Sequence, residues 1–173
     1  GLESSRQRRF YSGRSGSGPG EGDDVVIAGQ AKGNDTMDGG AGDDLLNYGD
    51  AANYGGNGSV NIDLTVVHAD GFTTVIDPFG DTDLIKNFES IRGTGGDDSI
   101  IGDAANNDFV GRAGSDLLGG GIGDDTLDGN LGNDSLTGGV GSDLIEGGSG
   151  QDTLVGGADD DHLVGGAHAD QFV

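Results

Sequence analysis

The sequence of 173 residues contains no cysteine, no tryptophan, two prolines and one methionine. Without cysteine, neither a disulfide framework nor a thiolate metal site can form. Basic residues are also scarce, because eight Lys and Arg stand against 31 Asp and Glu and leave a net charge of −23. A chain this acidic is disfavoured as a nucleic-acid binder. No apolar run reaches transmembrane length, so we expect no membrane-spanning segment.

Glycine, by contrast, is abundant, with 39 residues. High glycine content, high net charge and few aromatic residues would usually indicate a disordered acidic spacer. The glycines are periodic, however. Residues 93–173 divide into nine consecutive nonapeptides of the form Gly-Gly-x-Gly-x-Asp-x-Φ-x, where Φ is apolar. Such a period predicts a repeat architecture and argues against the spacer interpretation.

The apolar eighth position of each nonapeptide predicts the core. Three residues x-Φ-x form a short strand with one inward side chain, which cannot build a core alone. Two such strands must therefore face each other across a flattened coil. We predict an all-β fold, a parallel β-solenoid with two nonapeptides, or 18 residues, in each coil. The inward side chains are Ile100, Phe109, Leu118, Leu127, Leu136, Ile145, Leu154, Leu163 and Phe172. The glycines at positions one, two and four are expected to form the turns, because glycine adopts positive φ without a steric clash.

The sixth positions predict a metal site. Coils stacked every 18 residues bring these side chains into two rows. The first row is Asp98, Asp116, Asp134, Asp152 and Asp170, and the second row is Asn107, Asp125, Asp143 and Asp161. Carboxylates about 4.8 Å apart, one strand spacing, repel one another unless a cation lies between them. Calcium accepts six to eight hard oxygens in flexible geometry, including backbone carbonyls, whereas zinc prefers His or Cys and magnesium a stricter octahedron.

The rest of the chain divides into three further segments. Residues 1–18 are basic and then rich in Gly and Ser, as in a flexible linker or an expression remnant. Residues 19–53 form a first repeat block, in which Asp24, Asp35 and Asp44 occupy sixth positions. Residues 54–92 lack the period. A first residue other than Met suggests a processed piece or fragment of a larger polypeptide.

The insert of residues 54–92 has strand signals of its own. Apolar and polar residues alternate over residues 60–66, which indicates a half-buried strand. A turn signal at Ala69-Asp70-Gly71 and an apolar segment at Phe72–Ile76 predict a hairpin, which Asp77-Pro78 ends. Leu84, Ile85, Phe88 and Ile91 are expected in the core.

The nonapeptides resemble those of the RTX (repeats-in-toxin, haemolysin-type calcium-binding) family. The resemblance covers residues 93–173, residues 19–47 with one insertion, and Asn87–Thr94, which is similar to the family's lead-in to a repeat block. It implies a right-handed parallel β-roll and a place in a secreted or cell-surface bacterial protein. It also implies calcium ions between coils, held by sixth-position carboxylates and by main-chain carbonyls of the turns.

The resemblance assigns the ligands residue by residue. The implied carboxylates are Asp24, Asp35, Asp44, Asp98, Asp116, Asp125, Asp134, Asp143, Asp152, Asp161 and Asp170. The implied glycine positions are Gly114, Gly121, Gly123, Gly129, Gly132, Gly138, Gly139, Gly141, Gly147, Gly148, Gly150, Gly156, Gly157 and Gly165. Counting four gaps in the first row, two in the second and one for Asp24 with Asp44, we expect about six or seven calcium ions.

Three functions fit the sequence to different degrees. The first is a calcium-dependent structural and secretion-assisting module that folds outside the cell and serves other domains of a larger polypeptide or a surface assembly. The second is a carbohydrate-binding accessory module of an extracellular enzyme, of the alginate type, which a basic or aromatic groove would favour. The third is an enzyme, but the sequence has no HExxH, GxSxG or Walker motif, so we expect no catalytic activity.

Overall fold

A computed structural model describes residues 22–28, 33–49 and 58–173. The predicted linker at 1–18 and the end of the first block at 50–53 lie outside these residues. The described chain is built from strands and turns. None of its segments is a helix long and apolar enough to cross a membrane. Its strands are β1 (Val25–Ile27), β2 (Thr36–Asp38), β3 (Leu45–Asn47), β4 (Asn61–Asp63), β5 (Thr73–Ile76), β6 (Thr82–Lys86), β7 (Ser90–Arg92), β8 (Ser99–Ile101), β9 (Asp108–Ala113), β10 (Leu117–Ile122), β11 (Thr126–Leu131), β12 (Ser135–Val140), β13 (Leu144–Ser149), β14 (Thr153–Ala158), β15 (His162–Ala167) and β16 (Gln171–Phe172).

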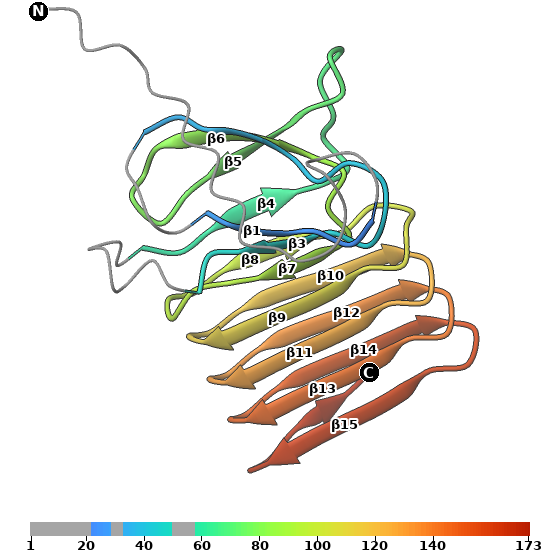
Figure 1. Cartoon of the computed structure of the whole chain (residues 1–173). Helices are drawn as coiled ribbons and strands as arrows, with labels where there is room; N and C mark the ends of the chain where they lie inside the picture. Colours follow the sequence, from blue (N-terminus) through green and yellow to red (C-terminus); the bar gives the residue numbers. More distant parts are fainter. Residues whose placement is uncertain (1–21, 29–32, 50–57) are drawn as a thin grey trace, which may run out of the picture.

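The strands form two facing sheets. One sheet has seven strands in the order β1-β3-β7-β9-β11-β13-β15, and the other has nine in the order β16-β14-β12-β10-β8-β4-β5-β6-β2. From β8 onward successive strands alternate between the sheets, so the chain winds as stacked flattened coils toward its C-terminal end (Figure 1). The prediction of an all-β parallel β-solenoid is confirmed.

The register between coils is 18 residues throughout the second block. Leu118 pairs with Leu136, and Leu136 pairs with Leu154, so the eighth positions stack directly on one another. All the eighth-position side chains from Ile100 to Leu154 are fully buried. Each such side chain contributes about 2 kcal/mol of hydrophobic stabilisation, and together they form a ladder between the two sheets. At the last coil no further coil covers the core side chain, and Phe172 is 56% exposed.

The turns divide the glycine positions into two kinds. At positions two and four the backbone has positive φ, for example 113° at Gly121 and 129° at Gly123. Non-glycine residues adopt the same region where they replace these glycines, with φ of 88° at Arg112 and 90° at His168. The first-position glycines, such as Gly129, are not among the residues with positive φ. The prediction that position one needs glycine for its φ was therefore wrong, and its actual constraint lies at the carboxylate row.

The strands of the second block are longer than the three residues predicted. Strands β9 to β15 each have six residues, because the coil continues to pair through the third position of the next nonapeptide. Gly121 pairs with Gly139 and Ile122 with Val140 in this extension. Each coil therefore gains backbone hydrogen bonds on both sides of its turn.

The insert contains the predicted hairpin turn and a second hairpin that was not predicted. Strand β5 pairs with β6 over four residue pairs, whereas β4 and β5 share one pair, Asn61 with Ile76. The predicted turn at residues 69–71 is present, since the N–H of Gly71 donates to His68 O at 2.9 Å and Val67 bridges Thr73 in antiparallel fashion. The more extensively paired hairpin, β5 with β6, turns at residues 77–81 and was not predicted. Val66 is 55% exposed instead of continuing the buried alternation, while Ile85, Phe88 and Ile91 are buried as expected. The segment of residues 64–72 projects from the roll as a narrow loop (Figure 1).

Candidate metal centre

The sixth-position carboxylates use one oxygen to fasten neighbouring coils. The N–H of Asp116 donates to Asp134 Oδ1 at 2.8 Å, and the N–H of Asp134 donates to Asp152 Oδ1 at 2.9 Å. The second row repeats this arrangement, with the N–H of Asp125 donating to Asp143 Oδ1 at 2.9 Å. Each carboxylate is thus oriented by an N–H from the preceding coil. The rows predicted from the 18-residue period are the rows that the fold produces.

The other oxygen of these carboxylates is buried and has no hydrogen-bond partner. Buried Oδ2 atoms without a partner belong to Asp24, Asp44, Asp116, Asp125, Asp134, Asp143 and Asp152. An unpaired buried carboxylate oxygen is costly, because it loses water without gaining a donor. A repeated cost of this kind requires a ligand that each carboxylate can bind.

In the second block, the space next to each unpartnered Oδ2 adjoins a first-position glycine. A Cβ on Gly138 or Gly147 would collide with the Oδ2 of Asp143 or Asp152 in the same repeat. It would also lie 2.7 Å from Gly156 O in the first case and 2.8 Å from Gly165 O in the second. Gly129 and Gly156 likewise face the Oδ2 of Asp134 and Asp161. The open space is therefore bounded by a carboxylate oxygen and by a carbonyl oxygen of the next coil.

Glycines at positions two and four also bring coils close together. A Cβ on Gly132 would collide with Gly114 O, and one on Gly139 would collide with Gly121 O. The remaining predicted glycines of these positions lie in the same stacked turns. They are Gly123, Gly141, Gly148, Gly150 and Gly157.

The atoms that face each such space are therefore hard oxygens, one from a carboxylate and one from a backbone carbonyl, which suits calcium. No three His, Cys, Asp or Glu side chains converge in the described ranges as a tetrahedral zinc site would require. The residues present therefore fit the ion predicted from the rows.

Burial raises the pKa of several row carboxylates. The pKa of Asp116 is raised to about 7 and that of Asp125 to about 6, mainly because burial disfavours the charged form. The N–H bonds from Asp98 and Asn107 oppose these shifts, and neighbouring carboxylates of each row add to them. The pKa of Asp134 and of Asp143 is raised for the same first reason. Without a cation, the rows therefore resist full ionisation at neutral pH.

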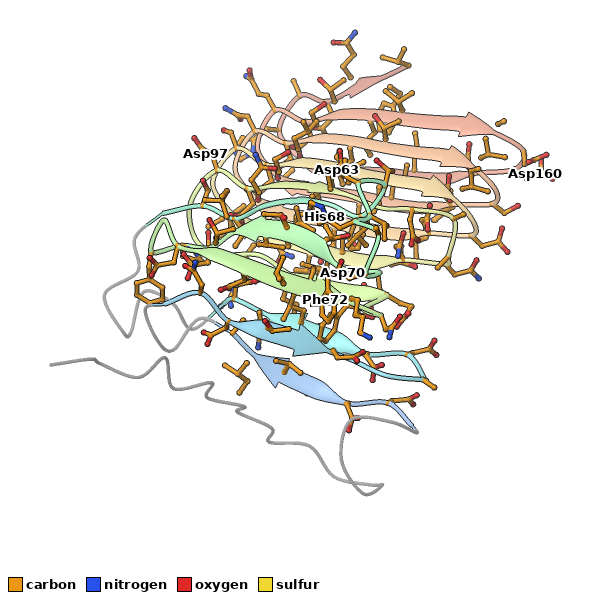
Figure 2. The ribbon with its side chains drawn as sticks, turned by 90° about the horizontal axis from the view of Figure 1, so that it is seen from above. Asp63, His68, Asp70, Phe72, Asp97 and Asp160 are labelled. Carbon is orange, nitrogen blue, oxygen red and sulfur yellow. The ribbon has the colours of Figure 1, made fainter. Side chains whose placement is uncertain are left out.

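Fifth-position side chains also link neighbouring coils, but their Oδ1 accepts an N–H from the following coil instead of the preceding one. Asp97 Oδ1 accepts the N–H of Ser115 at 2.7 Å, and Asp124 Oδ1 accepts the N–H of Ser142 at 2.9 Å. Asp97 precedes β8 of the nine-stranded sheet, and Asp160 precedes β15 of the seven-stranded sheet. Figure 2 shows these two fifth-position residues on opposite edges of the roll. The two carboxylate rows therefore run along separate edges.

The first block continues these rows with unequal spacing. The N–H of Asp24 donates to Asp44 Oδ1 at 2.7 Å, so the predicted pair is stacked across 20 residues. Asp35 does not stack on another residue of its block. Its N–H donates instead to Asp83 Oδ1 at 2.8 Å, across 48 residues.

Sequence reasoning did not assign Asp83 or Glu89 to the rows. Asp83 precedes Ile85, and Glu89 precedes Ile91, each by two residues, and both isoleucines are fully buried. An acidic residue two positions before a core residue was the signal that could have identified them. The glycines that mark such units elsewhere are missing from the insert.

Two positions of the rows depart from the pattern. Asn107 donates its Nδ2 to Glu89 O at 3.3 Å and so replaces the carboxylate link with an amide. Asp98 Oδ2 accepts the N–H of Thr94 at 2.6 Å, so this oxygen already has a donor. In the neighbouring coil, the residue whose N–H donates to Asp98 Oδ1 is Val60, which has no carboxylate. Oxygens for a cation are therefore depleted in both rows around this coil.

Comparison with known proteins agrees with this arrangement. The family model for the RTX calcium-binding nonapeptide repeat matches four times, over residues 20–54, 88–118, 119–154 and 146–173. These matches cover more than half of the chain and include both carboxylate rows. No curated protein matched the chain.

Proposed function

Because the chain belongs to the RTX calcium-binding nonapeptide-repeat family, we propose that it is a calcium-dependent folding module of a secreted or cell-surface bacterial protein. The observation that carries the proposal is the set of buried Oδ2 atoms without partners, which in the second block all lie beside a first-position glycine. The ligands of the proposed sites are the sixth-position carboxylates together with turn carbonyls. Bound calcium supplies positive charge that offsets the repulsion and desolvation of the carboxylate rows.

We expect about six or seven ions in the chain. Counted by position, the first row offers gaps from Asp98 to Asp170, the second from Asp125 to Asp161, and Asp24 with Asp44 offers one more. The gap at Asp98 is the weakest of these, because its Oδ2 already accepts the Thr94 N–H. Seven divalent ions would change the net charge of −23 to about −9, which removes more than half of the self-repulsion that opposes compaction.

The charge of the metal-free chain gives calcium a switching role. Weak calcium sites of extracellular modules have dissociation constants of about 10⁻⁴–10⁻³ M, far above cytosolic calcium levels. The chain would therefore remain unfolded inside the cell and fold after export. Each coil supplies only part of every site, so folding should propagate cooperatively along the stack. In this role the module is a scaffold for other domains or for a surface assembly, and we assign it no catalytic step.

Circular dichroism with a calcium titration tests this function. We expect a coil-like spectrum in chelator, a sigmoidal gain of β-signal with added calcium, and a much smaller response to magnesium. Isothermal titration calorimetry should count the bound ions. A chain that is fully folded in chelator, or that binds two or fewer calcium ions when folded, would overturn the proposal.

One observation favours the carbohydrate-binding alternative. A cavity of about 740 Å³ is lined by Arg92 and Arg112, together with Asn47 and Asn130. Neither arginine forms an ion pair with another described residue, since the one ion pair among them joins Lys86 and Asp38 at 3.0 Å. Two guanidinium groups with amides beside them suit a carboxylate-bearing sugar.

Calorimetry with oligouronates in saturating calcium tests this second candidate. Binding should be lost in Arg92→Ala and Arg112→Ala and kept in Lys86→Ala, whose cation lies outside the cavity. Absence of binding by the native chain would leave the folding module as the supported function.

A further inference from the structure

The second carboxylate row, which contains Asn107 and Asp125, extends from the second block through Glu89 of the insert to the first repeat block. The N–H of Asp44 donates to Glu89 Oε2 at 3.0 Å, and the N–H of Ser90 donates to Asp44 O at 3.0 Å. Strands β3 and β7 pair in parallel, with Leu46 opposite Ile91. Glu89 therefore stands in the sixth position of the coil that follows Asp44, although 45 residues separate the two.

Between Asp44 and Glu89, the Asp44 carboxylate has one oxygen without a hydrogen-bond partner. Asp44 is fully buried, and its Oδ2 has no hydrogen-bond partner. Its Oδ1 is already occupied by the N–H of Asp24. The unpartnered oxygen is thus held in a fixed direction, as in the second block.

A glycine keeps the adjoining space open. A Cβ on Gly39 would lie 2.7 Å from Asp44 Oδ2 and would collide with Asn87 O. Asn87 has a φ of 56°, which turns the chain just before β7. The carbonyl that bounds the space therefore comes from the insert, while the carboxylate oxygen comes from the first repeat block.

The same geometry recurs where the sequence is regular. At Gly129 a Cβ would meet Asp134 Oδ2 and would lie 2.7 Å from Gly147 O, and Asp152 of the next coil accepts the N–H of Asp134. Gly39, Asp44, Asn87 and Glu89 occupy the corresponding places, although Asn87 and Glu89 are two residues apart where Gly147 and Asp152 are five apart. The period that identifies the regular sites is absent, because Glu replaces Asp and a long insert replaces a nonapeptide.

We infer that Asp44, the Asn87 carbonyl and Glu89 form a calcium site that joins the first repeat block to the insert. The inference rests on the proposed function, since it assumes that the rows bind calcium. It extends that function by making the docking of residues 58–92 onto the first block dependent on calcium. Asp44 would then serve two sites, one toward Asp24 and one toward Glu89.

Glu89→Gln tests the site, because glutamine keeps an oxygen that can accept the Asp44 N–H but loses the charge. We expect native mass spectrometry and calorimetry in calcium to show one ion fewer per chain. The matched control is Glu146→Gln, which makes the same change at an exposed glutamate of β13. The control should retain the full number of ions.

Gly39→Ala provides a second test, since its methyl group would fill the space next to Asp44 Oδ2. The matched control is Gly95→Ala, because a Cβ at Gly95 meets nothing within 4 Å. We expect Gly39→Ala to lose one ion and Gly95→Ala to lose none. Gly39 does not require positive φ, so the substitution acts by crowding both Asp44 Oδ2 and the Asn87 carbonyl.

The outcomes separate the inference from the proposed function. A native chain that binds no calcium would refute the proposed function and this site with it. A native chain that binds calcium, with the full ion count kept in Glu89→Gln, would overturn the inference alone, whatever Gly39→Ala does. Loss of one ion in Glu89→Gln, with Glu146→Gln unchanged, would support it.

Discussion

The second repeat block and the N-terminal half of the roll build the same carboxylate rows from different sequence spacings. In the second block, sixth-position residues that are joined by an N–H to Oδ1 bond between coils are 18 positions apart, as in Asp116 with Asp134. In the N-terminal half the corresponding separations are 20, 45 and 48 residues. The constant feature is therefore the contact between coils, and chain length between contacts varies.

The boundary between these two regions lies where both rows lose charge. One row has Val60 below Asp98, and the other has Asn107 between Glu89 and Asp125. Burial still raises the pKa of Asp98, but its oxygens accept hydrogen bonds from Thr94 and Val60. The two regions are therefore expected to hold separate groups of ions around a coil that depends on protein hydrogen bonds.

The largest expected difference between the regions concerns their cores. Leu136 is fully buried between two other leucines of the ladder, whereas Met37 in β2 is partly buried at the edge of its sheet. Leu136→Ala should lower the free energy of unfolding by about 2–5 kcal/mol, because it leaves a cavity in the stack. Met37→Ala should cost less. Urea unfolding in saturating calcium measures both, and equal losses would contradict a core centred on the second block.

The next largest effect is on ion binding within the second block. Asp134 links to both neighbouring coils, since it accepts the N–H of Asp116 and donates its own N–H to Asp152. Asp134→Ala should therefore weaken two adjacent sites, and calorimetry should show up to two fewer ions. If only one site is affected, the carboxylate is not shared between the coils above and below it.

Much of this arrangement was predictable from the sequence, and the regular block most of all. Equal coil lengths mean that positions such as Asp116 and Asp134 meet wherever the period holds, so sequence distance translates into contact. In the insert, sequence distance no longer predicts which residues are in contact. Asp83 and Glu89 reach the rows through strands β6 and β7, whose partners are chosen by core packing of Ile85 and Ile91 over distances that no period records.

The turn glycines show a second limit of sequence reasoning. Positive φ was predictable at positions two and four, where the backbone reverses. At position one the pattern alone could not show that the constraint is space for a carboxylate oxygen from the same repeat, as between Gly147 and Asp152. That constraint depends on a contact five residues away in a folded turn.

The pH dependence of the metal-free chain is a subtler test, centred on the second block. The folded-state pKa of Asp116 is about 7 and that of Asp125 about 6, above the ordinary value of 3.8. Groups with raised folded pKa values stabilise the fold most below their unfolded value, and this stability is lost as pH rises through the folded value. In chelator, the β-signal should therefore decrease between about pH 4 and pH 7.

Calcium should reverse the sign of this dependence, because protons compete with the ion for the same carboxylates. The calcium midpoint should shift to higher concentration as pH falls below about 7. Asp116→Asn should reduce the pH dependence in chelator. A β-signal in chelator that rises from pH 4 to pH 7 would contradict the assigned role of burial.

The smallest expected effect on calcium is at the boundary residue, Asn107. Its side chain is neutral, its Nδ2 donates to Glu89 O at 3.3 Å, and its Oδ1 accepts the N–H of Asp103 at 3.2 Å. Asn107→Ala removes these hydrogen bonds and should lower the stability of the calcium-saturated fold by about 1–3 kcal/mol, because buried groups lose partners. It removes no carboxylate, so the ion count and the calcium midpoint should change little beside those of Asp134→Ala. Calorimetry on the two variants, run under one set of conditions, makes the comparison direct. Equal loss of calcium binding in both would mean that the rows do not distinguish a charged sixth position from a neutral one, and the division of the roll into two calcium-binding regions would fail with it.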